Sequence, residues 1–94
     1  MEPESSVAAP GCVVRVRYFA GARAAAGTSA ETLTLPGGFT VSDAIRTLAE
    51  RHGQRLSAVL RAASFLLDGV AVRDTSISLP ANGELDILPP FAGG

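Results

Sequence analysis

The chain has 94 residues, which suffices for one small domain but not for two. Its apolar share of 47% allows a hydrophobic core, whereas its formal net charge of −1, without any basic block, argues against nucleic acid as a partner. All 8 positively charged residues are arginine, so this chain has neither a Schiff-base lysine nor a lysine acceptor for isopeptide attachment.

The single cysteine, Cys12, cannot form an internal disulfide, which suits a reducing compartment and predicts a cytoplasmic protein. No apolar run approaches the length of a membrane span, so we expect no membrane partner. Residues Met1–Gly11 lack the apolar centre of a signal peptide. We therefore expect a flexible leader over residues 1–11, one domain over 12–90 and a C-terminal tail over 91–94.

The first regular pattern is an alternation of side chains over Val13–Phe19, which predicts a half-buried strand. The face expected in the core carries Val14, Val16 and Tyr18, and the opposite, open face carries Val13, Arg15, Arg17 and Phe19. The alanine-rich stretch Ala20–Gly27 then predicts one or two helical turns. A second alternation over Glu31–Pro36 predicts a strand that pairs with the first as a hairpin, with the helical turns inserted between them.

The clearest helix follows at Thr40, a favourable N-cap whose partner in a capping box would be Asp43. An apolar stripe with helical spacing runs through Val41, Ala44, Ile45, Leu48 and Ala49. We expect Gly53 to end this helix. The same spacing recurs at Leu56, Val59 and Leu60, which predicts either a second short helix or a kinked continuation of the first.

After Ser64 the period returns to two. The run Phe65–Leu67, the turn Asp68-Gly69 and the return Val70–Val72 predict a hairpin. A further short extended piece is expected at Ile77 and Leu79, and a turn at Asn82-Gly83. The last predicted strand, Glu84–Leu88, directs Leu85 and Ile87 inward and Glu84, Asp86 and Leu88 to the other face. This order of elements predicts an α+β fold with a sheet packed on one main helix, the sheet being mixed if the last strand returns beside the first.

Residues suited to catalysis are few. His52 lies in the last turn of the predicted helix, where a solvated histidine favoured by the helix dipole is the simplest interpretation. Cys12 has no electropositive surroundings in the sequence, so a structural role is favoured. No group of residues has metal-ligand spacing, and we expect no cofactor or metal bound by this chain.

The C-terminal segment Pro89-Pro90-Phe91-Ala92-Gly93-Gly94 is the remaining candidate. Two prolines stiffen the exit from a strand, and two glycines make a thin end that can thread a narrow channel. The α-carboxylate of Gly94 is ionised at neutral pH. We interpret the preceding residues as a scaffold that presents this carboxylate to other proteins.

The chain resembles the small subunits of molybdopterin synthase, a family of ubiquitin-like, β-grasp sulfur carriers, over about residues 13–94. The resemblance is carried by Val14-Arg15-Val16-Arg17-Tyr18-Phe19-Ala20, by Arg23, and most specifically by Leu88-Pro89-Pro90-Phe91-Ala92-Gly93-Gly94. It implies a carrier that is not catalytic alone but acts as the sulfur-carrying subunit of a sulfurtransferase complex. The implied partners are the large synthase subunit, in a heterotetramer, and an adenylyltransferase of the ubiquitin-activating type that uses ATP and magnesium.

The resemblance also assigns roles to residues. Gly94 would be adenylated and converted to a thiocarboxylate, which would donate its sulfur to cyclic pyranopterin monophosphate. Gly93, which has no side chain, would keep the end of the tail narrow enough to enter a close-fitting channel. The residues expected to dock on the large subunit are Phe19, Arg23, Leu88, Pro89, Pro90 and Phe91. The competing interpretations are ordinary packing for Phe19, Leu88 and Phe91, strand termination for the two prolines, and a solvated helix position for Arg23.

Two features depart from the family pattern, namely the absence of lysine and the leader Met1–Gly11. Arginine can replace lysine as a cation, but the geometry of its charge pairs differs. The alternatives are a sulfur carrier for thiamin or cysteine synthesis, a ubiquitin-like modifier, and a non-catalytic interaction module whose tail is incidental. ATP-dependent exchange of oxygen for sulfur at the terminus would distinguish a carrier from an interaction module.

Overall fold

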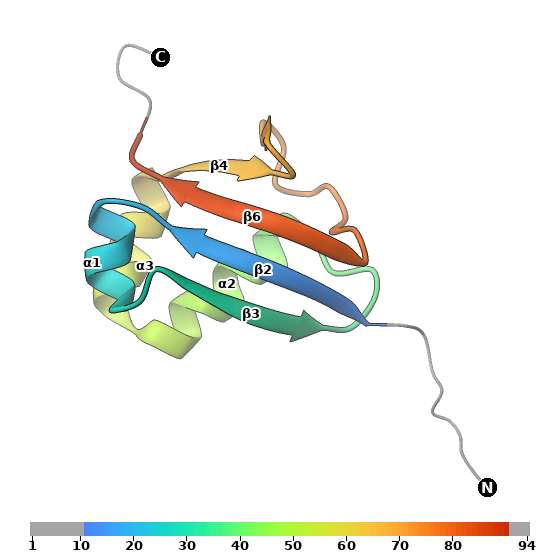
Figure 1. Ribbon diagram of the computed structural model, residues 1–94, viewed down its shortest axis with the longest axis horizontal. Coiled ribbons are helices and arrows are strands. Elements are labelled where there is room, and N and C mark those ends of the chain that lie inside the picture. The colour runs from blue at the N-terminus through green and yellow to red at the C-terminus, as the bar shows by residue number, and fades with distance from the viewer. Residues whose placement is uncertain (1–10, 91–94) are drawn as a thin grey trace, which may run out of the picture.

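The computed structural model describes residues 11–90, which form one five-stranded sheet with helices packed on one of its faces (Figure 1). The strand order across the sheet is β3-β2-β6-β4-β5. The strands are β2 (Cys12–Tyr18), β3 (Ala30–Leu35), β4 (Ser64–Leu67), β5 (Val70–Ala71) and β6 (Asn82–Leu88). The helices are α1 (Gly21–Ala26), α2 (Val41–His52) and α3 (Gln54–Ala62).

Strand β2 lies between an antiparallel neighbour and a parallel one. It pairs with β3 from Cys12↔Leu35 to Arg17↔Ala30, which confirms the predicted hairpin. On its other side it pairs in parallel with β6, from Val13↔Asn82 to Tyr18↔Ile87. The sheet is therefore mixed, as predicted for a last strand that returns beside the first. Because β2 and β6 run in the same direction, both end at the same edge of the sheet, next to α1 (Figure 1).

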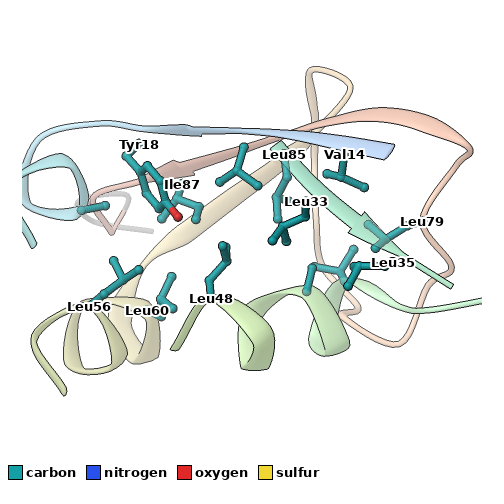
Figure 2. Close-up of a cluster of buried hydrophobic side chains, with 14 of the residues drawn as sticks. Val14, Tyr18, Leu33, Leu35, Leu48, Leu56, Leu60, Leu79, Leu85 and Ile87 are labelled. Carbon is teal, nitrogen blue, oxygen red and sulfur yellow. The ribbon is translucent and has the colours of Figure 1, made fainter. Parts of the chain in front are cut away.

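The core fills the space between the sheet and the helices (Figure 2). The inward faces of the strands contribute Val14, Val16, Tyr18, Leu33, Leu35, Leu85 and Ile87, all of them buried. From the helices come Ala22, Val41, Ala44, Leu48, Leu56 and Leu60. Both alternating patterns and the helical stripe are thus confirmed, because each apolar face is removed from water by the layer opposite.

Local capping fixes the helix boundaries. The hydroxyl of Thr40 accepts a hydrogen bond from the backbone N–H of Asp43, and the Asp43 carboxylate accepts one from the Thr40 N–H, so the capping box is present. Gly53 has a φ of 87°, a conformation that side chains disfavour, and it separates α2 from α3. Of the two predicted possibilities, a second short helix is therefore correct.

One expectation for the start of β6 was wrong. Asn82-Gly83 is not a turn, because both residues already belong to β6 and pair with Val13 and Val14 of β2. Long-range parallel pairing overrides the local turn preference of this dipeptide. The short extended piece predicted at Ile77 and Leu79 is present as an isolated antiparallel bridge between Ser78 and Thr40.

Among the described residues, no helix has the length and apolar character needed to cross a lipid bilayer.

Candidate functional site at the end of strand β6

The base of the C-terminal tail, residues 87–90, is the end of strand β6 and the two prolines that follow it, and this strand is anchored in the core. Leu85 and Ile87 of β6 are fully buried, Leu88 is half-buried, and Pro89 and Pro90 are exposed. The chain therefore passes from the core into solvent within two residues. Phe91, Gly93 and Gly94, which carry the predicted chemistry of the tail, lie outside the described residues.

The tail base is flanked by two other parts of the fold. On one side Leu88 pairs with Ser64 of β4. On the other side the backbone N–H of Phe19 donates a 3.0 Å hydrogen bond to the carbonyl of Ile87. The Phe19 side chain is 38% exposed and lies on the open face, as predicted. The tail base thus has an exposed aromatic residue beside it, and the exposed Arg23 lies on the adjoining helix α1.

An ion-pair network lies next to the tail base on the open face of the sheet. Arg17 donates two hydrogen bonds to Asp86, from Nε to Oδ1 at 2.7 Å and from Nη2 to Oδ2 at 2.8 Å. Its Nη2 also lies 3.4 Å from Oε1 of Glu84. The guanidinium carbon of Arg17 is 5.6 Å from the centre of the Phe19 ring, within the range of a cation–π contact. The network therefore connects β6 to Phe19.

A second polar cluster lies on the core side of the same end of the sheet. The Tyr18 hydroxyl and Nε2–H of His52 both donate to Oε2 of Glu31, and Arg51 donates to Oε1 at 2.8 Å. The Tyr18 and His52 rings meet edge to face, with centroids 5.9 Å apart. The cluster fastens the C-terminus of α2 to the β2–β3 hairpin.

Burial and hydrogen bonding act on the ionisable groups of this cluster. Burial raises the pKa of Tyr18, and its hydrogen bond to Glu31 raises that pKa further. For Glu31, burial alone would raise the pKa, but the hydrogen bonds from Tyr18, Arg51 and His52 outweigh it and lower the pKa below its ordinary value of 4.5. Glu31 is therefore held as a carboxylate.

The interpretation of His52 as a solvated histidine was wrong. Its side chain is only 18% exposed and its ring is held by Glu31 and Tyr18. Cys12 is buried and its thiol donates to the carbonyl of Leu79 at 3.6 Å, which fits the structural role predicted for it. Within residues 11–90 no group of three His, Cys, Asp or Glu side chains is placed to hold a metal ion.

A shallow depression of about 400 Å³ lies on the sheet at the N-terminal ends of β2 and β6. Its lining includes Val13, Arg15 and Asn82. This is the opposite end of β6 from the tail, so the depression is separate from the tail base.

Sequence analysis identified some of these site residues and missed others. Phe19, Arg23, Leu88, Pro89 and Pro90 gather at one end of the sheet, although no contact within the described residues tests their docking role. The Arg17–Asp86 pair and the Glu31–His52 contact were missed. Only the register between β2 and β6, which places Arg17 opposite Asp86, could have indicated the Arg17–Asp86 pair. No local sequence pattern indicated the Glu31–His52 contact.

Comparison with known proteins is consistent with this geometry. The sequence pattern of the ThiS family matches residues 16–94. A molybdopterin synthase sulfur carrier subunit from Mycosarcoma maydis is 36% identical over 86 residues, which cover 86% of this chain and 92% of that protein.

Two solved structures share the β-grasp fold. One is a putative molybdopterin converting factor, subunit 1, from Pyrococcus furiosus, with 25% identity, a TM-score of 0.77, and coverage of 85% of this chain and 99% of that one. The other is the small archaeal modifier protein 1 from Methanosarcina acetivorans, with 26% identity, a TM-score of 0.75, and coverage of 89% and 98%.

Proposed function

The chain belongs to the ThiS family, and on that premise we propose that it is the sulfur-carrier subunit of a molybdopterin synthase. One observation carries the proposal. Strand β6 is anchored by fully buried Leu85 and Ile87 and leads directly to exposed prolines, beyond which the sequence runs to Gly93-Gly94. A rigid base followed by a narrow end suits a terminal carboxylate that one enzyme converts to a thiocarboxylate and from which a second enzyme takes the sulfur.

The proposed loading step activates the carboxylate of Gly94. One of its oxygens attacks the α-phosphate of ATP on an adenylyltransferase that binds magnesium, which gives an acyl-adenylate and pyrophosphate. A persulfide sulfur then attacks the acyl carbon and AMP leaves. A thiol reduces the resulting S–S bond, so the terminus becomes a thiocarboxylate.

The proposed unloading step occurs on the large synthase subunit. The relative from Mycosarcoma maydis is a subunit of such a synthase, which supports a second subunit as the partner of this chain. The tail enters that subunit's pocket and the thiocarboxylate gives its sulfur to cyclic pyranopterin monophosphate. Two sulfurs are needed for the dithiolene of the product, so carriers act in turn, in a heterotetramer with the large subunit.

The residues around the tail base form the proposed docking surface. Phe19 is an exposed aromatic residue, and aromatic side chains contribute much of the binding energy of many interfaces through the large area they bury. Pro89 and Pro90 fix the backbone φ angle and so reduce the entropy that the tail loses on insertion. Arg23, Leu88 and Phe91 complete the set carried over from the sequence.

Reconstitution tests the proposal. The carrier is incubated with its adenylyltransferase, ATP and a sulfide source, and then with the large subunit and cyclic pyranopterin monophosphate. We expect molybdopterin to form with the full chain and not with a matched variant that lacks Gly94. Product formation at equal rates by both chains would contradict the proposal.

The likeness to the small archaeal modifier protein supports a second candidate, a ubiquitin-like protein modifier. In that case the activated Gly94 would form an isopeptide bond with a lysine of another protein. Incubation with the adenylyltransferase, ATP and a cell extract would then give covalent adducts of higher mass. Molybdopterin formation without such adducts would favour the sulfur-carrier function.

A further inference from the structure

Asp86 has an unusual place in the fold. It lies on the open face of β6, yet its side chain is only 8% exposed, and it is the one buried charged residue in the part of the chain that the structure describes. A carboxylate removed from water requires strong partners. Both of its oxygens receive hydrogen bonds from Arg17, at 2.7 and 2.8 Å, in the two-pronged geometry that arginine provides.

Arg17 connects this buried carboxylate to the proposed docking residue Phe19. Arg17 lies in β2 and Phe19 directly follows that strand, and the side chains of both are on the exposed side of the sheet. The guanidinium carbon lies 5.6 Å from the centre of the Phe19 ring. Because Asp86 fixes the guanidinium, and the guanidinium contacts the ring, Asp86 restricts the orientations that the ring can adopt.

Stability alone gives a poor account of this arrangement. Only Asp86 of the pair is buried, whereas the Arg17 side chain is 44% exposed. The cost of removing the carboxylate from water offsets much of its attraction to the guanidinium. Neighbouring positions on this face include Leu66, which pairs with Asp86 across β4 and β6, so an apolar side chain would suit the position of Asp86. The ion pair is explained better by the geometry that it imposes on its surroundings.

That geometry is imposed at the base of the tail. Asp86 is two residues before Leu88 on the same face of β6, and the Phe19 N–H is bonded to the intervening Ile87. An aromatic ring that is already ordered loses less entropy when a partner covers it.

We infer that Asp86 and Arg17 are positioning residues that hold the Phe19 ring in the orientation in which it docks on the large synthase subunit. The docking part of this inference rests on the proposed function, because that function supplies the partner. The ordering of the Phe19 ring in the free chain is independent of the proposed function.

The experiment compares the wild-type chain with the double variant Arg17→Met/Asp86→Leu, which replaces the ion pair by apolar side chains. The matched control is Arg15→Met, which removes a positive charge from the same face of β2. Side-chain NMR relaxation of a labelled Phe19 ring reports its order in the free chain. We expect the ring to become mobile in the double variant and to stay ordered in the control, and equal order in all three chains would overturn the inference.

Binding to the large subunit is then measured with and without Phe19→Ala. In the wild-type background this substitution should weaken binding about tenfold, as for an aromatic anchor. In the Arg17→Met/Asp86→Leu background it should weaken binding by less than about threefold, because the ring is no longer held in place. Equal losses in the two backgrounds would show that Phe19 acts independently of the ion pair and would overturn the inference.

Two further outcomes are informative. Arg17→Lys keeps the charge but not the two-pronged geometry, so we expect it to mobilise the ring as the double variant does. A lysine variant with wild-type ring order and affinity would show that charge alone suffices, which contradicts the inference. If the wild-type chain does not bind the large subunit at all, the docking function fails, while the ring measurement still decides whether the ion pair orders Phe19.

Discussion

Gly83 of β6 packs against Pro80 in the segment before that strand. A Cβ added at Gly83 would lie 2.7 Å from Cγ and 3.2 Å from Cδ of Pro80, and 3.6 Å from Cδ1 of Leu67. The proline ring cannot rotate away, so in Gly83→Ala the backbone must shift. Overpacking of this kind costs about 1–3 kcal/mol. The lower entropy of an unfolded alanine returns about 0.4–1 kcal/mol.

The midpoints of these two ranges predict that Gly83→Ala lowers the free energy of unfolding by about 1–2 kcal/mol. For a domain of this size that corresponds to a fall in Tm of about 4–16 °C. Thermal and urea unfolding followed by circular dichroism measure both quantities. The matched control is Gly21→Ala in α1, where nothing lies within 4 Å of the added Cβ and alanine favours the helix.

The control should have the same Tm as the wild-type chain or a higher one. A Gly83→Ala chain as stable as the wild type would refute the packing of Gly83 against Pro80. It would also weaken the assignment of Asn82-Gly83 to the strand that leads to the tail.

Four other predictions concern the tail base, the polar cluster, the thiol and the terminus. Phe19→Ala should weaken binding to the large subunit about tenfold in calorimetric titration yet change the unfolding free energy by less than about 1 kcal/mol, because the ring is partly exposed; unchanged affinity would remove Phe19 from the docking surface. Glu31→Gln should be less stable than the wild type at neutral pH. Because folding lowers the pKa of Glu31, the extra stability of the wild-type chain is fully present at pH values above 4.5 and is lost as the pH falls through the pKa of the folded state. The urea unfolding curves of the two chains should therefore converge in acid. A difference in stability that persists in acid would contradict the role given to the Glu31 carboxylate. Cys12→Ser should leave sulfur transfer intact, and loss of transfer would place the sulfur on the thiol instead. Deletion of Gly94 should abolish thiocarboxylate formation without changing the unfolding curve, and a thiocarboxylate on the shortened chain would count against Gly94 as its site.

Much of the fold could be predicted because it follows from local periodicity. The alternation over β2 placed Tyr18 in the core and Phe19 on the open face, since successive side chains of a strand point to opposite faces. The capping box at Thr40 and Asp43 could be read directly, because its two residues are three apart in the sequence.

The errors arose where distant pairing decides the local conformation. Asn82-Gly83 has the composition of a tight turn, but its pairing with the start of β2, about 70 residues earlier, places it in a strand. The same limit applies to the candidate site. Arg17 and Asp86 are 69 residues apart, and Glu31 and His52 are 21 apart, so no sequence window contains either contact.

The site also shows what periodicity cannot predict about burial. Asp86 was correctly placed on the open face by alternation, yet it is buried because Arg17 covers it from β2. Burial on that face depends on the register between two strands and on the length of the arginine side chain. Sequence analysis predicted the position of the residue but not its environment.

The most direct test of the sulfur-carrier function is the intact mass of the chain after incubation with its adenylyltransferase, ATP and a sulfide source. We predict that the mass rises by the difference between one sulfur and one oxygen atom, that fragmentation assigns the change to Gly94, and that it does not occur without ATP. A mass that stays constant with every component present, or a change that fragmentation assigns to Cys12, would contradict the account.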